Sequence, residues 1–336
     1  MKKLSASNYI SLVYILFLIT IFFNDCGKSE NPVKFPHGIF PDTVVNLVGL
    51  NSAFDDYNTS GYQLNGALPL IFSSNRRTSG GQFDLEQGLI TFSFDQTDGT
   101  FILNTGMTED PFMNKLIDAA ETTLNDFGPY RIFSAYDGFE YFIVSSENSD
   151  GNLDLFYCKN LPSYGSTLPD IDGPHSVTLL NTGYDDAYLS FDLNLDTAYF
   201  TSNIEGNFDI YLKARPVGKN VAEWFNQDYG ISEKIDSINS SSDDECPIVY
   251  NKFMVFTSNR AGGNGGYDLY YSVFRKGNWS SPVNFGPKIN SANDEFRPLI
   301  GNYSDFTNIY MIFSSDRPGG KGDFDLYFVG IEVPDK

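Results

Sequence analysis

The chain has 336 residues, of which 41% are hydrophobic and 16% aromatic, and its formal net charge is −21. A chain of this length and composition can bury a large core. Its strong negative charge argues against nucleic acids and anionic lipid headgroups as partners. The three cysteines and two histidines form no Cys-x-x-Cys or Cys/His cluster, so a structural zinc site is not expected.

The first 25 residues predict a signal peptide. Lys2 and Lys3 give a basic start, and the largely apolar run over 9–23 is shorter than the ~20 residues of a membrane span. Cys26 follows, in a pattern that resembles a bacterial lipoprotein signal of the Bacteroidetes type. We therefore expect lipid attachment at Cys26, a tether over 26–43, and export to the outer membrane in either leaflet. An uncleaved anchor and ordinary secretion are the alternatives.

The remaining chain, 44–336, carries one sequence phrase five times. An apolar run ends in Ser-Ser or Thr-Ser, a polar turn rich in glycine follows, and an Asp-Leu or similar pair begins a second apolar run. The copies lie at 69–89, 140–158, 198–214, 253–273 and 309–330. Each copy predicts a β-hairpin.

Further short strands before and after each hairpin give four antiparallel strands per unit. This repeat length and strand count are typical of a β-propeller blade. We therefore predict an all-β, five-bladed β-propeller. A six-bladed alternative would need a further blade hidden between residues 89 and 130.

A helical insertion is predicted near residues 106–127, within the longest interval between two copies. Its apolar residues fall on one face of a helix, namely Phe112, Leu116, Ala119, Ala120 and Leu124.

The last copy of the phrase has no room for a fourth strand before Lys336. Residues 44–57 read like 282–296, which follow the hairpin of the preceding unit. We therefore expect the N-terminal strand to close the last blade, which removes an open sheet edge.

The segment from Phe313 to Tyr327, FSSDRPGGKGDFDLY, resembles the WD-like propeller repeat of the TolB type. The resemblance implies an exported bacterial propeller in which the phrase is structural. It also implies protein binding in place of catalysis.

Acidic clusters recur before each predicted inner strand, on the face that carries the arginine-containing turns. Clustered carboxylates could cap the turns, perform acid/base chemistry on a sugar, or hold a cation. The arginines could pair with carboxylates of neighbouring blades or bind an acidic or carbohydrate ligand. The candidate binding face comprises Arg76, Arg260, Arg317, Asp186, Asp244, Glu245, Asp294 and Glu295.

One turn has the oxygen spacing of a short calcium loop, without the bidentate glutamate of an EF-hand. Its candidate ligands are Asn148, Asp150, Asn152 and Asp154. The same residues also align with an ordinary blade turn. Calcium here is the one cofactor that the sequence suggests.

The main hypothesis is a non-enzymatic envelope lipoprotein without catalytic residues. Its monomeric propeller would bind or scaffold an envelope protein or a glycan. The alternative is a glycoside hydrolase of the five-bladed arabinanase/levansucrase type, which would place three unlike carboxylates in the central channel.

Overall fold

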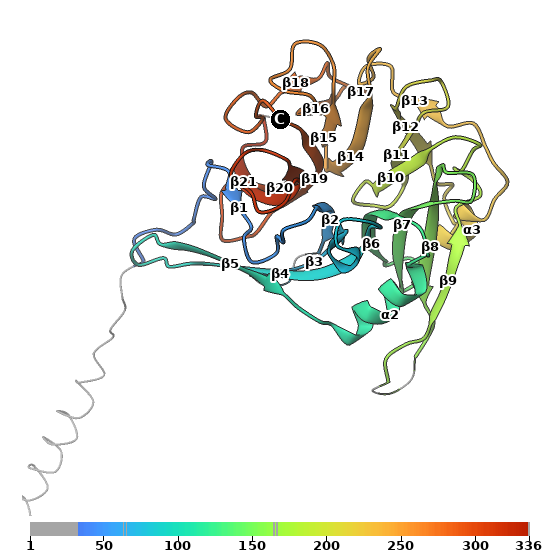
Figure 1. The fold of residues 1–336 in the computed structure, drawn as a ribbon, viewed down its shortest axis with the longest axis horizontal. Coiled ribbons are helices and arrows are strands. Elements are labelled where there is room, and N and C mark those ends of the chain that lie inside the picture. Colours follow the sequence, from blue (N-terminus) through green and yellow to red (C-terminus); the bar gives the residue numbers. More distant parts are fainter. Residues whose placement is uncertain (1–32, 63, 65, 164, 166, 335–336) are drawn as a thin grey trace, which may run out of the picture.

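The computed structural model describes residues 33–334 apart from 63, 65, 164 and 166. The predicted signal peptide and Cys26 lie outside these residues. Five antiparallel sheets surround a common axis, and β2, β6, β10, β14 and β19 are the innermost strands (Figure 1). The prediction of an all-β, five-bladed propeller is confirmed, and the six-bladed alternative is wrong. Within the described residues, no helix is long and apolar enough to cross a membrane.

Each blade runs outward from the axis in chain order. Blade 1 contains β2 (Asp56–Gly61), β3 (Ala67–Ser74), β4 (Asp84–Phe94) and β5 (Phe101–Met107), and the short 3₁₀ helix η1 (Arg76–Thr78) follows β3. Blade 2 contains β6 (Asp126–Ser134), β7 (Phe139–Glu147), β8 (Leu153–Asn160) and β9 (Ile171–Ser176). Blade 3 contains β10 (Asp186–Phe191), β11 (Thr197–Ser202), β12 (Asp209–Ala214) and β13 (Glu233–Lys234), with helix α3 (Val221–Phe225) before β13.

Blade 4 has two short outer strands in place of one. It contains β14 (Asp244–Tyr250), β15 (Phe253–Ser258) and β16 (Asp268–Arg275), and both β17 (Asn278–Trp279) and β18 (Val283–Asn284) pair with β16. Blade 5 contains β19 (Glu295–Gly301), β20 (Ile309–Ser315) and β21 (Asp325–Ile331), and its outer strand is β1 (Val45–Asn46).

The ring closes through the N-terminal strand, as the sequence predicts. Val45 pairs with Phe328 and Asn46 with Tyr327, so β1 covers part of the edge of β21 (Figure 1). The outer strand of the last blade thus comes from the beginning of the chain, and blade 5 joins segments that are far apart in sequence.

The packed part of the chain begins before residue 44, where the sequence analysis placed the end of the tether. Phe40 has no exposed surface, and its ring stacks on that of Phe306 with a centroid separation of 3.8 Å. Gly38 forms a parallel bridge with Phe306. The described tether residues from Gly38 onward therefore belong to the packing of the propeller.

The predicted insertion contains helix α2 (Pro111–Ala120). Asp110 caps it by accepting a hydrogen bond from the Met113 amide, and Pro111 occupies the first turn. Leu124, which the sequence placed on the buried face, is 41% exposed because the helix ends at Ala120. The helix lies at the outer margin of blades 1 and 2, away from the axis (Figure 1).

Every inner strand contains a β-bulge at its third residue. The register shifts there by one residue in all five blades, and the third residue has a φ near +50°. In three blades the bulged amide donates to a hydroxyl of the preceding blade: Asn58 to Ser314, Tyr188 to Ser145 and Cys246 to Thr201. The bulges therefore connect neighbouring blades close to the axis.

Candidate functional site at the channel mouth

The first residue of every inner strand is a fully buried carboxylate. Each one accepts a hydrogen bond from the backbone amide four residues earlier, which belongs to the segment entering the blade. These inner-strand carboxylates are Asp56, Asp126, Asp186, Asp244 and Glu295. Their repeated capping contacts assign them a structural role.

The residue before each inner strand links two blades. Asp55 accepts a hydrogen bond from the Phe324 amide, and Asp294 accepts one from the Tyr267 amide. Asp185 and Asp243 make the same contact with Leu153 and Phe208. Asp294, a member of the predicted binding face, is thus part of a repeated contact between blades.

The three turn arginines pair with carboxylates of their own blades and not with those of neighbouring blades. Arg317 Nη2 lies 2.9 Å from Glu295 Oε1, and it also donates to the Ile289 carbonyl at 2.6 Å. Arg76 and Arg260 make the equivalent contacts. Each guanidinium also lies over the ring of a core phenylalanine of the same blade. These side chains are engaged in holding the turn against the blade.

The second residues of the inner strands meet at the axis. Side chains from all five blades form one cluster there, and aromatic rings dominate it. Tyr57 stacks on Phe296 with a centroid separation of 5.3 Å, and Phe83 contacts Phe127 at 5.0 Å. The second-position residues are Tyr57, Phe127, Ala187, Glu245 and Phe296. We call them the channel mouth.

Glu245 is the one carboxylic acid among the five residues of the channel mouth, and the residue is 4% exposed. Burial raises the pKa of Glu245 to about 8, and the nearby Asp243 carboxylate adds to the increase by repulsion. Asp244 and Asp185 act in the same direction. Glu245 therefore holds a proton at neutral pH, as a general acid must.

Asp243 and Tyr267, both half-buried, influence Glu245 and contact each other. The Tyr267 hydroxyl donates to Asp243 Oδ2 at 3.0 Å, and the Asn259 side-chain amide donates to the same oxygen at 3.0 Å. Burial, with the charges of Glu245 and Asp243, raises the pKa of Tyr267. The hydroxyl accordingly stays protonated and fixes the Asp243 carboxylate.

The third residues of the inner strands form a layer next to the channel mouth. Arg297 is 4% exposed, and its guanidinium carbon lies 5.3 Å from the centroid of the Tyr188 ring. Burial raises the pKa of the neighbouring Cys246 thiol far above its usual value. The thiol is therefore neutral and unreactive at ordinary pH.

In the predicted calcium loop, the Asn148 side chain forms hydrogen bonds with other residues of the same loop. Asn148 Oδ1 accepts hydrogen bonds from the amides of Asp150 and Asn152, and Asn148 Nδ2 donates to Asp154 Oδ2 at 3.0 Å. Across the described residues, no three His, Cys, Asp or Glu side chains are grouped so that they could hold a metal ion.

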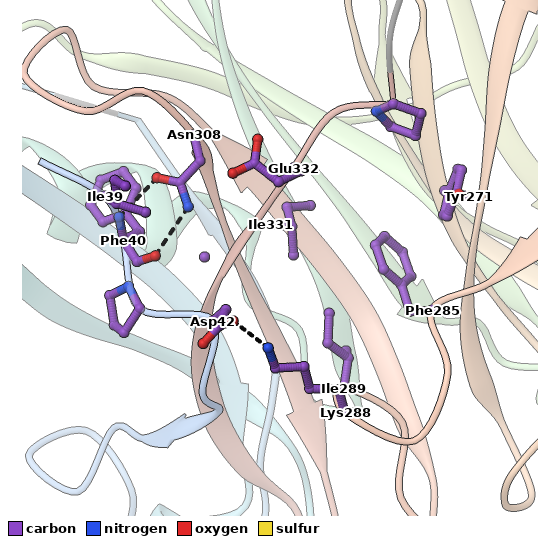
Figure 2. Close-up of a pocket in the computed structure, with 13 residues that line it drawn as sticks. Ile39, Phe40, Asp42, Tyr271, Phe285, Lys288, Ile289, Asn308, Ile331 and Glu332 are labelled. Carbon is purple, nitrogen blue, oxygen red and sulfur yellow. Dashed lines mark hydrogen bonds and ion pairs between the residues drawn. The ribbon is translucent and has the colours of Figure 1, made fainter. Parts of the chain in front are cut away.

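A cavity of about 560 Å³ lies at the outer margin of blades 4 and 5, away from the channel mouth. Figure 2 shows the Asp42–Lys288 ion pair at its edge and the Asn308 amide bound to the backbone of Phe40. These contacts fasten the N-terminal segment to blades 4 and 5.

Sequence reasoning placed Glu245 in the candidate face but did not separate it from Asp244. Asp185 and Asp243 belong to the recurring acidic clusters that the sequence shows, but the candidate binding face did not include them, and Tyr267 was not considered. Aligning the five inner strands on their first carboxylate would have distinguished Glu245, because the equivalent residues of the other blades are Tyr57, Phe127, Ala187 and Phe296.

Neither a protein-family profile nor a curated protein matches this sequence. Solved structures do match the fold. An α-L-arabinofuranosidase catalytic domain of Coprinopsis cinerea has a TM-score of 0.53 at 11% identity, covering 88% of this chain and 98% of its own. An exo-β-1,3-galactanase of Phanerochaete chrysosporium has a TM-score of 0.54 at 14% identity, covering 87% and 65%. An exo-1,5-α-L-arabinanase from a bovine ruminal metagenomic library has a TM-score of 0.50 at 13% identity, covering 85% and 96%.

These similarities establish the fold and correct two expectations. The structural neighbours are five-bladed glycoside hydrolases, so the resemblance to TolB-type WD-like repeats is wrong. The hypothesis of a non-enzymatic binding or scaffolding propeller loses its basis with that resemblance. The neighbours share the fold that the alternative names, that of five-bladed glycoside hydrolases.

Proposed function

We propose that this protein hydrolyses glycosidic bonds at the channel mouth, with Glu245 donating a proton to the oxygen of the departing sugar. The observation that carries the proposal is the position of Glu245, a single buried carboxylic acid among the aromatic side chains at the axis. A carboxylic acid in such surroundings stays protonated and can donate its proton to the leaving group.

Glycoside hydrolysis commonly requires a second carboxylate, which acts as a base or a nucleophile. Asp185 and Asp243 are the candidates, because both influence Glu245 electrostatically and are half-buried. Each also accepts hydrogen bonds from the backbone and from an asparagine side chain, which fix its orientation. Rigid orientation of this kind favours catalysis.

The surroundings of Glu245 favour a neutral sugar as substrate. Half-buried aromatic rings near it, including Tyr57 and Tyr267, can pack against the apolar face of a sugar ring. The nearby carboxylates and the net charge of −21 would repel acidic sugars. Export and anchoring through Cys26 stay predictions from the sequence, and they would place the substrate outside the cytoplasm.

The proposal is tested by incubating the purified protein with neutral arabinans, xylans and galactans and measuring the release of reducing ends. Hydrolysis of at least one polymer is expected, with a loss of at least 100-fold in Glu245→Gln. Glu233→Gln, at an exposed position, is the matched control and should retain full activity. Absence of hydrolysis in the unaltered protein, or full activity in Glu245→Gln, would contradict the proposal.

A further inference from the structure

Blade 3 lacks the turn arginine of blades 1, 4 and 5, and Ile204 stands in its place. Arg260 shows what this arginine does in blade 4. It pairs with Asp244, donates to the Ile238 carbonyl at 2.7 Å, and donates to Ser258 Oγ at 3.0 Å. Its guanidinium carbon lies 5.3 Å from the ring centroid of Phe256 and 5.0 Å from that of Tyr270.

Blade 3 retains the whole environment of that missing guanidinium. The inner-strand carboxylate, the carbonyl of the entering segment, the serine and the two aromatic rings are all present, and they surround a cavity of about 120 Å³. Asp186 corresponds to Asp244, Leu180 to Ile238, Ser202 to Ser258, Phe200 to Phe256 and Tyr211 to Tyr270. A cavity of this size exceeds the space that one water molecule needs.

Three polar atoms that line this cavity have no hydrogen-bond partner within the described structure. They are Asp186 Oδ1, the Tyr211 hydroxyl and Ser232 Oγ. Asp186 has no exposed surface, and Tyr211 is 6% exposed. Buried polar groups are normally hydrogen-bonded, and an unpaired one destabilises the folded state. The three atoms therefore define a site that lacks its donor and acceptor partners.

Blade 2 also lacks the arginine but leaves no comparable vacancy. Asn148 replaces the arginine and Val144 replaces the core phenylalanine. The Asp126 carboxylate is satisfied, because Ser146 Oγ and Thr122 Oγ1 both donate to its Oδ1. The loss of an arginine thus does not by itself leave the inner-strand carboxylate unpaired, and an unpaired inner-strand carboxylate beside a cavity is particular to blade 3 among the described residues.

The entrance of the cavity is formed by exposed side chains. Tyr229 is 49% and Ile231 88% exposed, and both line the cavity together with Glu205. Lys234 pairs with Glu205 and Asp209, and the Lys213 ammonium donates to the Ile231 carbonyl. No cation of the described residues pairs with Asp186. Exposed apolar residues around a buried carboxylate suit a partner chain that brings a cation.

We propose that this blade 3 cavity binds the guanidinium group of an arginine side chain from a partner polypeptide. The arginine would supply from outside the contacts that Arg76, Arg260 and Arg317 make within their own blades. It would pair with Asp186, donate to the Leu180 carbonyl, and lie against the rings of Phe200 and Tyr211. This inference does not depend on the glycosidase proposal.

The test measures binding of acetyl-arginine-amide by calorimetry and by the shift in Tm, at constant ionic strength. Acetyl-citrulline-amide is the matched neutral probe, and methylguanidinium is the probe without a peptide backbone. We expect acetyl-arginine-amide to bind at least tenfold more tightly than the citrulline probe and to raise Tm. Equal binding of the two amides, or binding of methylguanidinium alone, would overturn the proposal.

Ile204→Arg places the missing side chain in the chain itself and is the decisive variant. It should unfold at a higher temperature than the unaltered protein and show no Tm response to acetyl-arginine-amide. Ile204→Leu, which keeps the site apolar, should retain the response, and Asp186→Asn should weaken binding at least tenfold. An undiminished response in Ile204→Arg would show that the probe binds elsewhere and would overturn the proposal.

Discussion

Tyr267 donates a hydrogen bond from its hydroxyl to Asp243 Oδ2 at 3.0 Å, on a carboxylate two residues before Glu245. The contact fixes the Asp243 carboxylate near Glu245, and repulsion from that carboxylate raises the pKa of Glu245, whereas the Tyr267 hydroxyl itself acts in the opposite direction. The same hydrogen bond joins the blade 4 turn to the entry of its inner strand. Blade geometry and acid strength are therefore coupled at this point.

The pH dependence of hydrolysis should follow from the raised pKa of Glu245. Because the protonated acid is the active form, kcat/KM should fall as the pH rises through about 8, by about tenfold for each further unit. Measurement of kcat/KM between pH 5 and 10 tests this prediction. A decline that begins near pH 5, where an ordinary glutamic acid has lost its proton, would contradict it.

The same group should make stability depend on pH. The native state keeps the Glu245 proton up to about pH 8, whereas the unfolded chain loses it near pH 4.3. Stability from this group is therefore present at low pH and declines as the pH rises between these values, by up to about 1.4 kcal/mol per unit. Urea unfolding across this range should show a shallower decline in Glu245→Gln. An unchanged slope would mean that Glu245 ionises normally, and Glu233→Gln serves as the control.

Arg260 should contribute strongly to stability because Asp244 has no exposed side-chain surface. Arg260→Met leaves the buried carboxylate without its cation, and a loss of about 3–5 kcal/mol in the free energy of unfolding is expected. Lys252→Ala, at an exposed position of the same blade, should change it by no more than about 0.5 kcal/mol. Similar values for the two variants would refute the structural role of the turn arginines.

Substitution of Phe40 tests whether the packed propeller begins before residue 44. Its ring is fully buried and contacts five other aromatic rings, so Phe40→Ala should lower the free energy of unfolding by about 3–5 kcal/mol. Phe35, which is 43% exposed, provides the control, and Phe35→Ala should have a small effect. If Phe40→Ala were equally mild, residues before 44 would act as a tether after all.

The repeat made the blade count and the closure of the ring predictable, because Asp84, Asp154, Asp209, Asp268 and Asp325 mark one strand in each blade. The same regularity obscured the site. Asp244 and Glu245 are adjacent and both acidic, yet successive residues of a strand face opposite sides, so Asp244 caps a turn and Glu245 reaches the axis. The missing arginine at Ile204 is visible in the sequence, but the three unpaired atoms around its cavity come from separate segments that only folding brings together.

The role of Glu245 is tested most directly by comparing two leaving groups in the Glu245→Gln variant. A sugar leaving group needs protonation, whereas dinitrophenolate departs without it. The account predicts that Glu245→Gln loses at least 100-fold in kcat/KM on the oligosaccharide and less than tenfold on the dinitrophenyl glycoside of the same sugar. Equal losses on both substrates would contradict the assignment of Glu245 as the proton donor.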